Sequence, residues 1–436
     1  MGYNWMMAED ERLIEEDLEI TAATAGQAPI QLPGRVISVF PALAHRNFQL
    51  YFAGQAISLV GFWLQQVGLG FFVFQLTHSP FWVGVVAAVG GLPILIFTTF
   101  AGVFIDKLNK QKLLVITQVV DAMVAFTFGL SIFGHFASLP LILFLAFISG
   151  TTGSIDLPAR LTFIVEMVGK RDLASAIPMN NGVFNGARFV GPALAGALIA
   201  SFGVGWTFIL NGLSYIAGIW AIIAIRPVYS FEPQKENKHP LESLKEGLKF
   251  SFTHPQIFYF MVLASITAIF IWPYQTLMPV IAENIFAGGA KGLGSLLSAA
   301  GAGSLVGAVV TSALSRWKNK SNLVLAGLLI SSLSLILFSQ NKNFTIAHVL
   351  LFVAGFGVLI QVSTLNTLVQ LASPDNMRGR IMAVYLTMFV GMMPLGSFLA
   401  GTIAQKTSAL FTIGIGAVLV LVVGGFLYLR GVFSTL

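Results

Sequence analysis

Twelve long apolar stretches follow one another along the chain, and each has about the length that a helix needs to cross a lipid bilayer. A helix of about 20 apolar residues spans the hydrocarbon core at about 1.5 Å per residue. The stretches lie at 48–76, 81–105, 111–134, 138–166, 173–202, 204–225, 255–284, 291–315, 321–340, 344–372, 378–405 and 409–430. This pattern predicts an all-α membrane protein with twelve transmembrane helices.

The composition excludes the two main alternatives to a membrane protein. Of the 436 residues, 56% are hydrophobic and only 10% are charged, whereas a soluble domain carries about 25% charged residues. The chain has too few polar groups to cover a soluble surface. It is also far too apolar to remain disordered.

Several classes of functional site are missing from the sequence. The chain has no cysteine, and no two of its six histidines lie three or four residues apart. It also lacks the G-x-x-x-x-G-K-[ST] loop of ATP-driven pumps and any motif that pairs a nucleophile with a base. We therefore expect neither an enzyme nor an ATP-driven pump, and no metal or cofactor.

Polar segments divide the chain into four parts. Residues 1–44 form an acidic tail and linker, with seven of the 18 acids within the first 19 residues. One long polar segment, 226–254, separates six apolar stretches in 45–225 from six in 255–436. Its LESLKEGLKF sequence places leucines on one face and charges on the other, which predicts a cytoplasmic linker helix at the membrane surface.

Basic residues are distributed unevenly between the two sides of the predicted membrane. If both termini are cytoplasmic, that side holds 20 of the 24 Lys and Arg residues. The other side holds Lys291, Lys342 and Lys406, and Arg188 lies within the membrane. Because basic residues concentrate on the cytoplasmic side, we expect both termini there. The excess of bases is interpreted as topology charge, so no nucleic-acid partner is expected.

The two halves of the chain carry similar residues at a constant spacing of 209 positions. The matches fall at equivalent loops, as parallel repeats require. They are His45 and His254, Lys107 and Arg316, Glu166 and Asp375, and Arg171 and Arg380. The repeat predicts two six-helix bundles, the architecture of a transporter whose halves rock about a central site.

Two motifs resemble those of the major facilitator superfamily. The sequence from Gly102 to Lys107, followed by Lys110 and Lys112, resembles the superfamily's G-x-x-x-D-[RK]-x-G-[RK]-[RK] loop, with Asn109 in place of the second glycine. The fifth stretch contains Gly191-Pro192 and resembles the Gly-Pro signature of the superfamily's antiporters. Further stretches resemble the bacterial group that contains the enterobactin exporter and macrolide efflux proteins. They are Arg46-Asn-Phe, Thr77-His-Ser-Pro80, Pro158-Ala-Arg160, Asn185-Gly-Ala-Arg188 and Pro374-Asp-Asn-Met-Arg378-Gly379-Arg380.

The resemblance implies a secondary-active transporter in a bacterial inner membrane. The leading interpretation is a monomeric, proton-coupled antiporter that exports a small amphipathic compound, either a siderophore or a drug-like molecule. Its partners are then the small-molecule substrate, protons and membrane lipid. An importer or a lysophospholipid flippase of the same fold, or a sensor that transports nothing, stays open as an alternative.

The resemblance also implies gates at both ends of the central cavity. In the superfamily, the acid equivalent to Asp106 packs against the start of helix 11, here near Arg378. The Gly-Pro sequence forms an outer seal between helices 5 and 8. The alternatives are topology charges for the first set and simple helix packing for the second. The predicted gate residues are Gly102, Asp106, Lys107, Arg160, Arg378, Arg380, Gly191 and Pro192.

Three ionisable residues lie deep within the predicted helices, where a charge is costly and a function is expected. Asp121 is ten residues into the third stretch, Asp156 lies in the fourth and Arg188 in the fifth. Asp121 is the first candidate for proton coupling and Asp156 the second, with Arg188 organising them. Arg160 lies four residues after Asp156, so a fixed ion pair is an equally good interpretation of Asp156.

Helices 1, 4, 7 and 10 line the cavity in this superfamily. Amides and aromatic rings at their midpoints suit a bulky amphipathic ligand, although aromatic side chains in membrane helices also face lipid. The candidate substrate-binding residues are Gln55, Trp63, Gln65, Gln66, Trp272, Tyr274, Gln275, Gln361 and Asn366.

Overall fold

Helices make up nearly all of the described chain. The computed structural model describes residues 19, 30–105, 108–226, 240–374 and 377–431. Side chains are described for all of these residues except 98–105 and 240–244. Within these residues there is no strand, and eleven apolar helical segments are long enough to cross a membrane. One of the eleven holds two crossings, so the predicted all-α, twelve-span architecture is confirmed.

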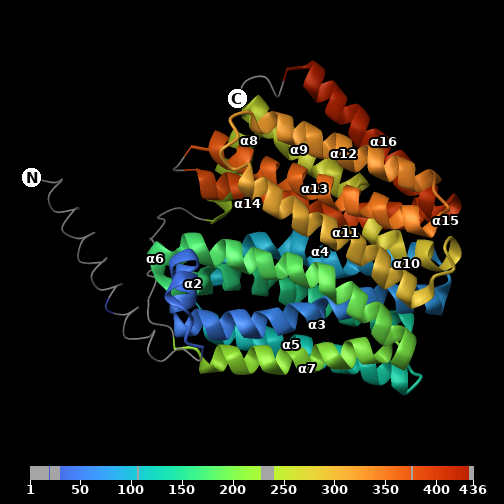
Figure 1. Ribbon diagram of the computed structural model, residues 1–436, viewed down its shortest axis with the longest axis horizontal. Coiled ribbons are helices and arrows are strands. Elements are labelled where there is room, and N and C mark those ends of the chain that lie inside the picture. Colours follow the sequence, from blue (N-terminus) through green and yellow to red (C-terminus); the bar gives the residue numbers. More distant parts are fainter. Residues whose placement is uncertain (1–18, 20–29, 106–107, 227–239, 375–376, 432–436) are drawn as a thin grey trace, which may run out of the picture.

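The first half contains six crossings in five helices (Figure 1). Two short helices, α2 (Gly34–Val39) and η1 (Pro41–Ala44), precede them. The crossings are formed by α3 (Arg46–Thr77), α4 (Pro80–Ile105), α5 (Lys110–Phe133), α6 (Leu139–Phe202) and α7 (Gly205–Ala224).

The long helix α6 supplies the fourth and fifth crossings. Its 64 residues would extend about 96 Å if straight, about three times the hydrocarbon thickness. The chain bends at Gly169, whose φ of 69° is rarely adopted by residues with a side chain. The bend falls between the predicted stretches 138–166 and 173–202, so the two crossings agree with the sequence.

The second half begins with the linker helix α8 and contains two crossings that are broken in the middle. The helices are α8 (Pro240–Thr253), α9 (Pro255–Phe270), α10 (Tyr274–Asn284), α11 (Gly289–Ala313), α12 (Lys320–Gln340), α13 (Phe344–Ala372), α14 (Arg378–Phe389), η2 (Val390–Met392), α15 (Met393–Lys406) and α16 (Ala409–Leu429). The predicted stretches 255–284 and 378–405 are therefore each two helices. Pro273 and Pro394 lie at the breaks, where proline has no backbone N–H to continue the helix.

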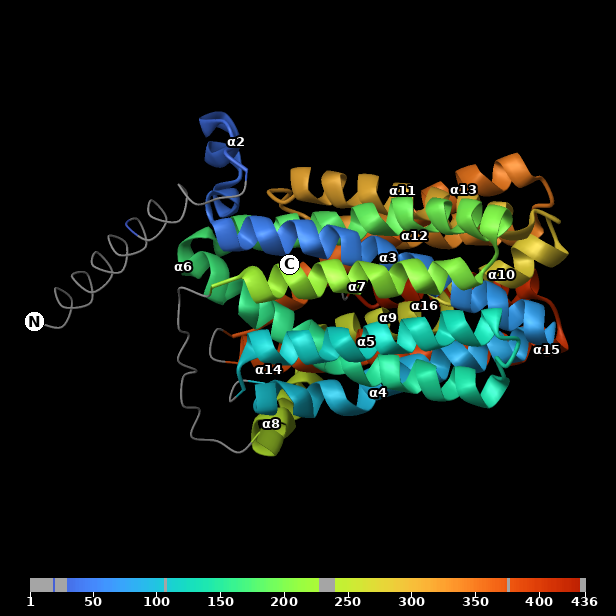
Figure 2. The ribbon, with the colours of Figure 1, turned by 90° about the horizontal axis from the view of Figure 1, so that it is seen from below.

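The two ends of the helix bundle differ, and both are visible in Figure 2. One end carries α2, α8 and the bend at Gly169, and we call it the linker face. The other end carries the α3–α4 connection and the α10–α11 connection, and we call it the distal face. At the linker face, Arg380 of α14 donates a hydrogen bond of 2.6 Å to Glu246 of α8. The linker helix is thus attached to the start of α14.

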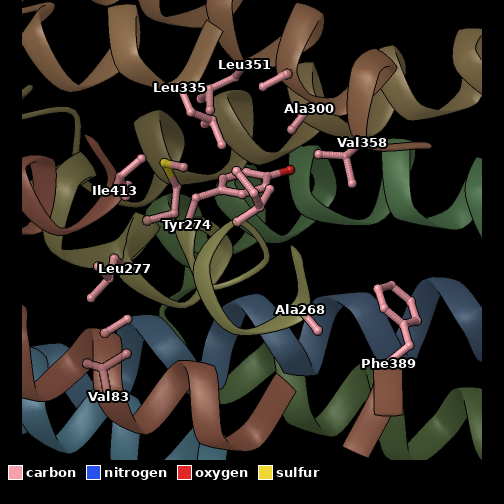
Figure 3. Packing of buried hydrophobic residues seen from close by; sticks show 14 of the residues in the cluster. Val83, Ala268, Tyr274, Leu277, Ala300, Leu335, Leu351, Val358, Phe389 and Ile413 are labelled. Carbon is pink, nitrogen blue, oxygen red and sulfur yellow. The ribbon is translucent and has the colours of Figure 1, made fainter. Parts of the chain in front are cut away.

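The buried apolar residues form two clusters. One contains residues of both halves, and the other contains residues of the first half alone. The larger cluster contains Phe71 and Val83 of the first half together with residues from all of the second half, such as Leu351. Figure 3 shows part of it around Tyr274. The smaller cluster lies in the first half at the linker face and includes Phe163. The halves therefore share one core toward the distal face and have separate cores toward the linker face.

Candidate functional site

Glycines allow the halves to touch backbone to backbone near the distal face. A side-chain carbon added at Gly196 of α6 would lie 2.6 Å from the Ala290 oxygen and 3.0 Å from Cα of Gly294 on α11. One added at Gly84 of α4 would lie 2.9 Å from Cα of Gly401 on α15. Contacts this close leave no room for any side chain. The distal end of the interface is tightly closed.

The contact between α6 and α11 ends partway toward the linker face. Among the glycines of α11, Gly301 makes the tight contact with α6 nearest the linker face, because a side-chain carbon there would lie 2.5 Å from the Arg188 oxygen. Nearer the linker face on α6, a carbon added at Gly186 or Gly182 would meet no atom within 4 Å. The same is true of Gly153 in the fourth crossing. At these three glycines, which lie nearer the linker face, the other half does not pack against the first.

Two carboxylates, one buried (Asp121) and one half-buried (Asp156), are held by threonines on α5 and α6. The Thr152 hydroxyl of α6 donates to Asp121 of α5 at 2.5 Å. One turn away, the Thr117 hydroxyl of α5 donates to Asp156 of α6 at 3.1 Å. The two helices thus exchange one hydroxyl-to-carboxylate bond in each direction. Within the part of the chain that the structure describes, Asp121 has no ion-pair partner within 4 Å.

Asp156, in contrast, belongs to an ion pair. Arg160 of α6 donates to Asp156 and, through a second nitrogen, to Gln55 of α3. Tyr51 of α3 contacts Arg160 and donates to Asn180 of α6 at 3.2 Å. The pairing expected from the four-residue spacing is confirmed. It ties α3 to both crossings of α6, on the side of Asp121 toward the linker face.

Arg188 lies apart from the acids, between two tryptophans. Its guanidinium carbon is 5.9 Å from the ring centre of Trp63 on α3 and 5.0 Å from that of Trp272, at the break between α9 and α10. Trp63 also contacts Phe184 edge-on, with ring centres 6.0 Å apart. The Tyr274 hydroxyl also contacts Arg188. The structure therefore joins four predicted site residues from both halves in one cluster, which we call the Arg188 cluster. Its members are Arg188, Trp63, Trp272, Phe184 and Tyr274.

The other predicted substrate-binding residues are scattered. Gln65 accepts a hydrogen bond of 2.8 Å from Asn211 of α7 inside the first half. Gln361 is fully buried and donates to Thr267 at 2.8 Å inside the second half. Both belong to helix packing away from the Arg188 cluster. Gln275 adjoins the Arg188 cluster, because it donates a hydrogen bond of 3.3 Å to the Tyr274 hydroxyl. Asn366 accepts a hydrogen bond of 2.6 Å from Gln370, and Gln66 is exposed.

The predicted gate residues fall at both faces. Asp106 and Lys107 lie outside the described residues, and of Gly102 the structure describes only its place in α4. Arg378 and Arg380 lie in the first turn of α14, at the linker face. Toward the distal face, a side-chain carbon at Gly191 would collide with Trp63, and the Pro192 oxygen lies against Gly294. The close packing expected between helices 5 and 8 is confirmed.

Five polar and aromatic residues of the site were not predicted from the sequence: Thr117, Thr152, Tyr51, Asn180 and Phe184. The two threonines carried a usable signal, because each lies four residues before one of the acids, on the same helix face. The other three are brought in only by tertiary contacts. Among the described residues, no three metal-ligating side chains gather into a cluster. The arrangement thus contains three chemically distinct groups. They are the carboxylate of Asp121, the ion pair of Asp156 and Arg160, and the Arg188 guanidinium against aromatic rings.

Known proteins with similar sequences are transporters. The staphyloferrin A transporter of Staphylococcus aureus is 23% identical, with 81% of this chain and 89% of that protein covered. The multidrug efflux pump Tap of Mycolicibacterium fortuitum is 25% identical, with 81% and 86% covered. The enterobactin exporter EntS of Shigella flexneri is 26% identical, with 82% and 85% covered.

Solved structures and a family description agree on the fold. The nucleoside transporter NupG superposes with a TM-score of 0.71 at 12% identity, covering 88% of this chain and 98% of that one. A bacterial homologue of the lysosomal transporter Spinster gives 0.71 at 13% identity, covering 89% and 96%. Residues 37–433 match the family described as transmembrane secretion effectors. The chain belongs to this family, within the major facilitator superfamily of membrane transporters.

Proposed function

We propose that the protein is a proton-coupled exporter that works by alternating access in a bacterial cytoplasmic membrane, with both termini in the cytoplasm. The halves meet tightly at the distal face and separate toward the linker face. With the basic linker face in the cytoplasm, this arrangement is the inward-facing state. The close glycine contacts would then part, and the linker face would close, in the outward-facing state.

Asp121 carries the proposal of proton coupling. It is 9% exposed, it lies within the third crossing, and its carboxylate is held by the Thr152 hydroxyl without a basic partner among the described residues. A buried acid of this kind is expected to have a function, because its charge is costly inside a membrane. Its loss and gain of a proton would favour different orientations of the halves.

The substrate and the direction of transport are inferred from two sources. Two of the relatives named above are an exporter and an efflux pump, and two of the names refer to a siderophore. The Arg188 cluster supplies aromatic rings from both halves and one cation from the first half. This chemistry suits a small amphipathic compound, siderophore-like or drug-like, that contacts both halves at once.

Everted membrane vesicles test this function directly. In such vesicles the cytoplasmic side faces outward, so an exporter driven by proton antiport should accumulate substrate when the lumen is acidified. We expect accumulation of at least one compound from a panel of labelled siderophores and dyes, and its loss when nigericin collapses the gradient. Vesicles without the protein are the control. Accumulation only with an alkaline lumen would indicate an importer and contradict the proposal.

A further inference from the structure

The Arg188 cluster occupies a special position relative to the internal repeat. Trp63 and Trp272 are 209 positions apart, as are the nearby glutamines Gln66 and Gln275. This is the same spacing that relates the loops of the two halves. The two tryptophans are therefore equivalent residues of the repeat, and both face one guanidinium, that of Arg188. Arg188 thus contacts the same repeat position in each of the two halves.

The charge of Arg188 has no counter-ion in the described part of the chain. Arg188 is 6% exposed, yet no described Asp or Glu lies within 4 Å of it. Its neighbours are the two rings and the Tyr274 hydroxyl. Arg160, the other arginine inside the first half, is paired with Asp156. A buried cation without an anion is costly, and contact with aromatic rings offsets only part of that cost.

The geometry of the cluster leaves Arg188 able to bind an anion. Contact with an aromatic ring engages the flat face of a guanidinium, whereas its N–H donors project in the plane and form a fork that matches a carboxylate. Trp63 Nε1, also buried, has no hydrogen-bond partner among the described groups. The site thus combines the Arg188 guanidinium and the unpaired Trp63 N–H with aromatic surface.

Exposed residues of α6 extend from the side nearer the linker face to Arg188. Ile177, Asn181 and Phe184 precede Arg188 on the same face of α6, at intervals of three or four residues, and all three are exposed. Exposure falls from 41% at Phe184 to 6% at Arg188. Arg188 therefore lies at the inner end of this face, next to the closed contact between the halves.

We infer that Arg188 is a binding site for the carboxylate of an aromatic or similarly planar substrate, whose ring stacks on Trp63, Trp272 or Phe184. This inference rests on the proposed transport function and makes its substrate class specific: the compounds carried bear an acidic group. Because Trp63 and Trp272 belong to different halves, a ligand bound at Arg188 lies between the two halves. Its binding is thereby linked to their relative orientation.

Calorimetry with two matched probes tests the site on the purified full-length protein in detergent. The probes are 1-naphthoate and 1-naphthamide, which share a ring system and differ in charge. We expect the wild-type protein to bind naphthoate at least about tenfold more tightly than naphthamide, as for a hydrogen-bonded charged group. Arg188→Gln should remove this preference. The matched control is Arg430→Gln, because Arg430 also lies over a ring, that of Phe426 at 5.1 Å.

A second variant covers the case in which Arg188→Gln does not fold. Arg188→Lys keeps the charge and loses the planar fork, so naphthoate should bind several-fold more weakly while naphthamide binding stays unchanged. Equal affinity of the wild-type protein for both probes, including no binding of either, would overturn the inference. So would a preference for naphthoate that survives in Arg188→Gln or Arg188→Lys at its full size.

This experiment separates the anion site from the transport function. Calorimetry in detergent needs no membrane and no pH gradient. A charge preference that depends on Arg188, found together with vesicles that accumulate nothing, would support the site and contradict the exporter. Proton-driven accumulation together with equal binding of the two probes would support the exporter and overturn the site.

Discussion

Replacing Asp121 by Asn should abolish transport driven by a pH gradient and leave substrate binding intact. Asparagine has nearly the same shape, and its side-chain oxygen can still accept the hydrogen bond from Thr152. It cannot take up or release a proton, so the conformational change is no longer linked to protonation. We expect accumulation in everted vesicles to fall to the level of vesicles without the protein. Thermal stabilisation by substrate, which reports binding, should persist.

Asp156→Asn is the matched comparison on the neighbouring helix. Asp156 is already paired with Arg160 and also accepts from a threonine, so its charge serves a structural contact. We expect this variant to lose stability and to keep proton-driven accumulation. If Asp156→Asn abolishes accumulation and Asp121→Asn does not, the coupling residue is Asp156. If neither variant changes accumulation, coupling through these two acids is refuted.

A single methyl group at Gly196 should shift the protein away from the state described here. The added carbon would lie 2.6 Å from the Ala290 oxygen and 3.0 Å from Cα of Gly294. Both are backbone atoms, so no side chain can rotate away, and α6 and α11 must separate at the distal face. Overpacking of this kind costs about 1–3 kcal/mol, and 1.4 kcal/mol changes a population ratio about tenfold. Gly196→Ala should therefore favour the state with an open distal face.

Spin-label distances measure this shift, and the absence of native cysteine means that labels attach only where cysteine is introduced. Ser201→Cys and Lys291→Cys mark the distal ends of α6 and α11, and both positions are exposed. Gly186→Ala is the control, because it adds the same methyl to α6 where no atom lies within 4 Å. The distance distribution should gain a longer component in Gly196→Ala alone. Unchanged distances, or the same change in Gly186→Ala, would refute the packing argument.

The membrane crossings could be predicted from the sequence because a bilayer imposes a length and a composition on each of them. The bend at Gly169 also coincided with the charged separator after residue 169. The breaks at 271–273 and 390–392 could not be predicted. Proline alone does not decide where a helix breaks, since α6 stays helical through each of its three prolines and departs from helical geometry only at Gly169. Neighbouring helices determine which prolines bend the chain, and a single sequence does not contain that information.

The site was predictable where partners are close in sequence and unpredictable where they are not. The pair of Asp156 and Arg160 follows from helical periodicity, and the structure contains it. Arg188 was expected to organise the acids, whereas its observed neighbours are Trp63 and Trp272. Those contacts depend on the packing of the second half against the first. The spacing of 209 positions between the tryptophans could be seen in the sequence. That Arg188 lies against both of them in space could not.

In the proposed mechanism, the two halves rock about a site between them under the control of protons. Two label pairs test it most directly: Ser201→Cys with Lys291→Cys at the distal face, and Ala174→Cys with Lys318→Cys at the linker face, all at exposed positions. Distances are measured by double electron–electron resonance in lipid nanodiscs across a pH series, with and without substrate. We expect one pair to lengthen as the other shortens, and Asp121→Asn to remove the response to pH. Distances that stay constant under all conditions, or that change in the same sense at both faces, would contradict it.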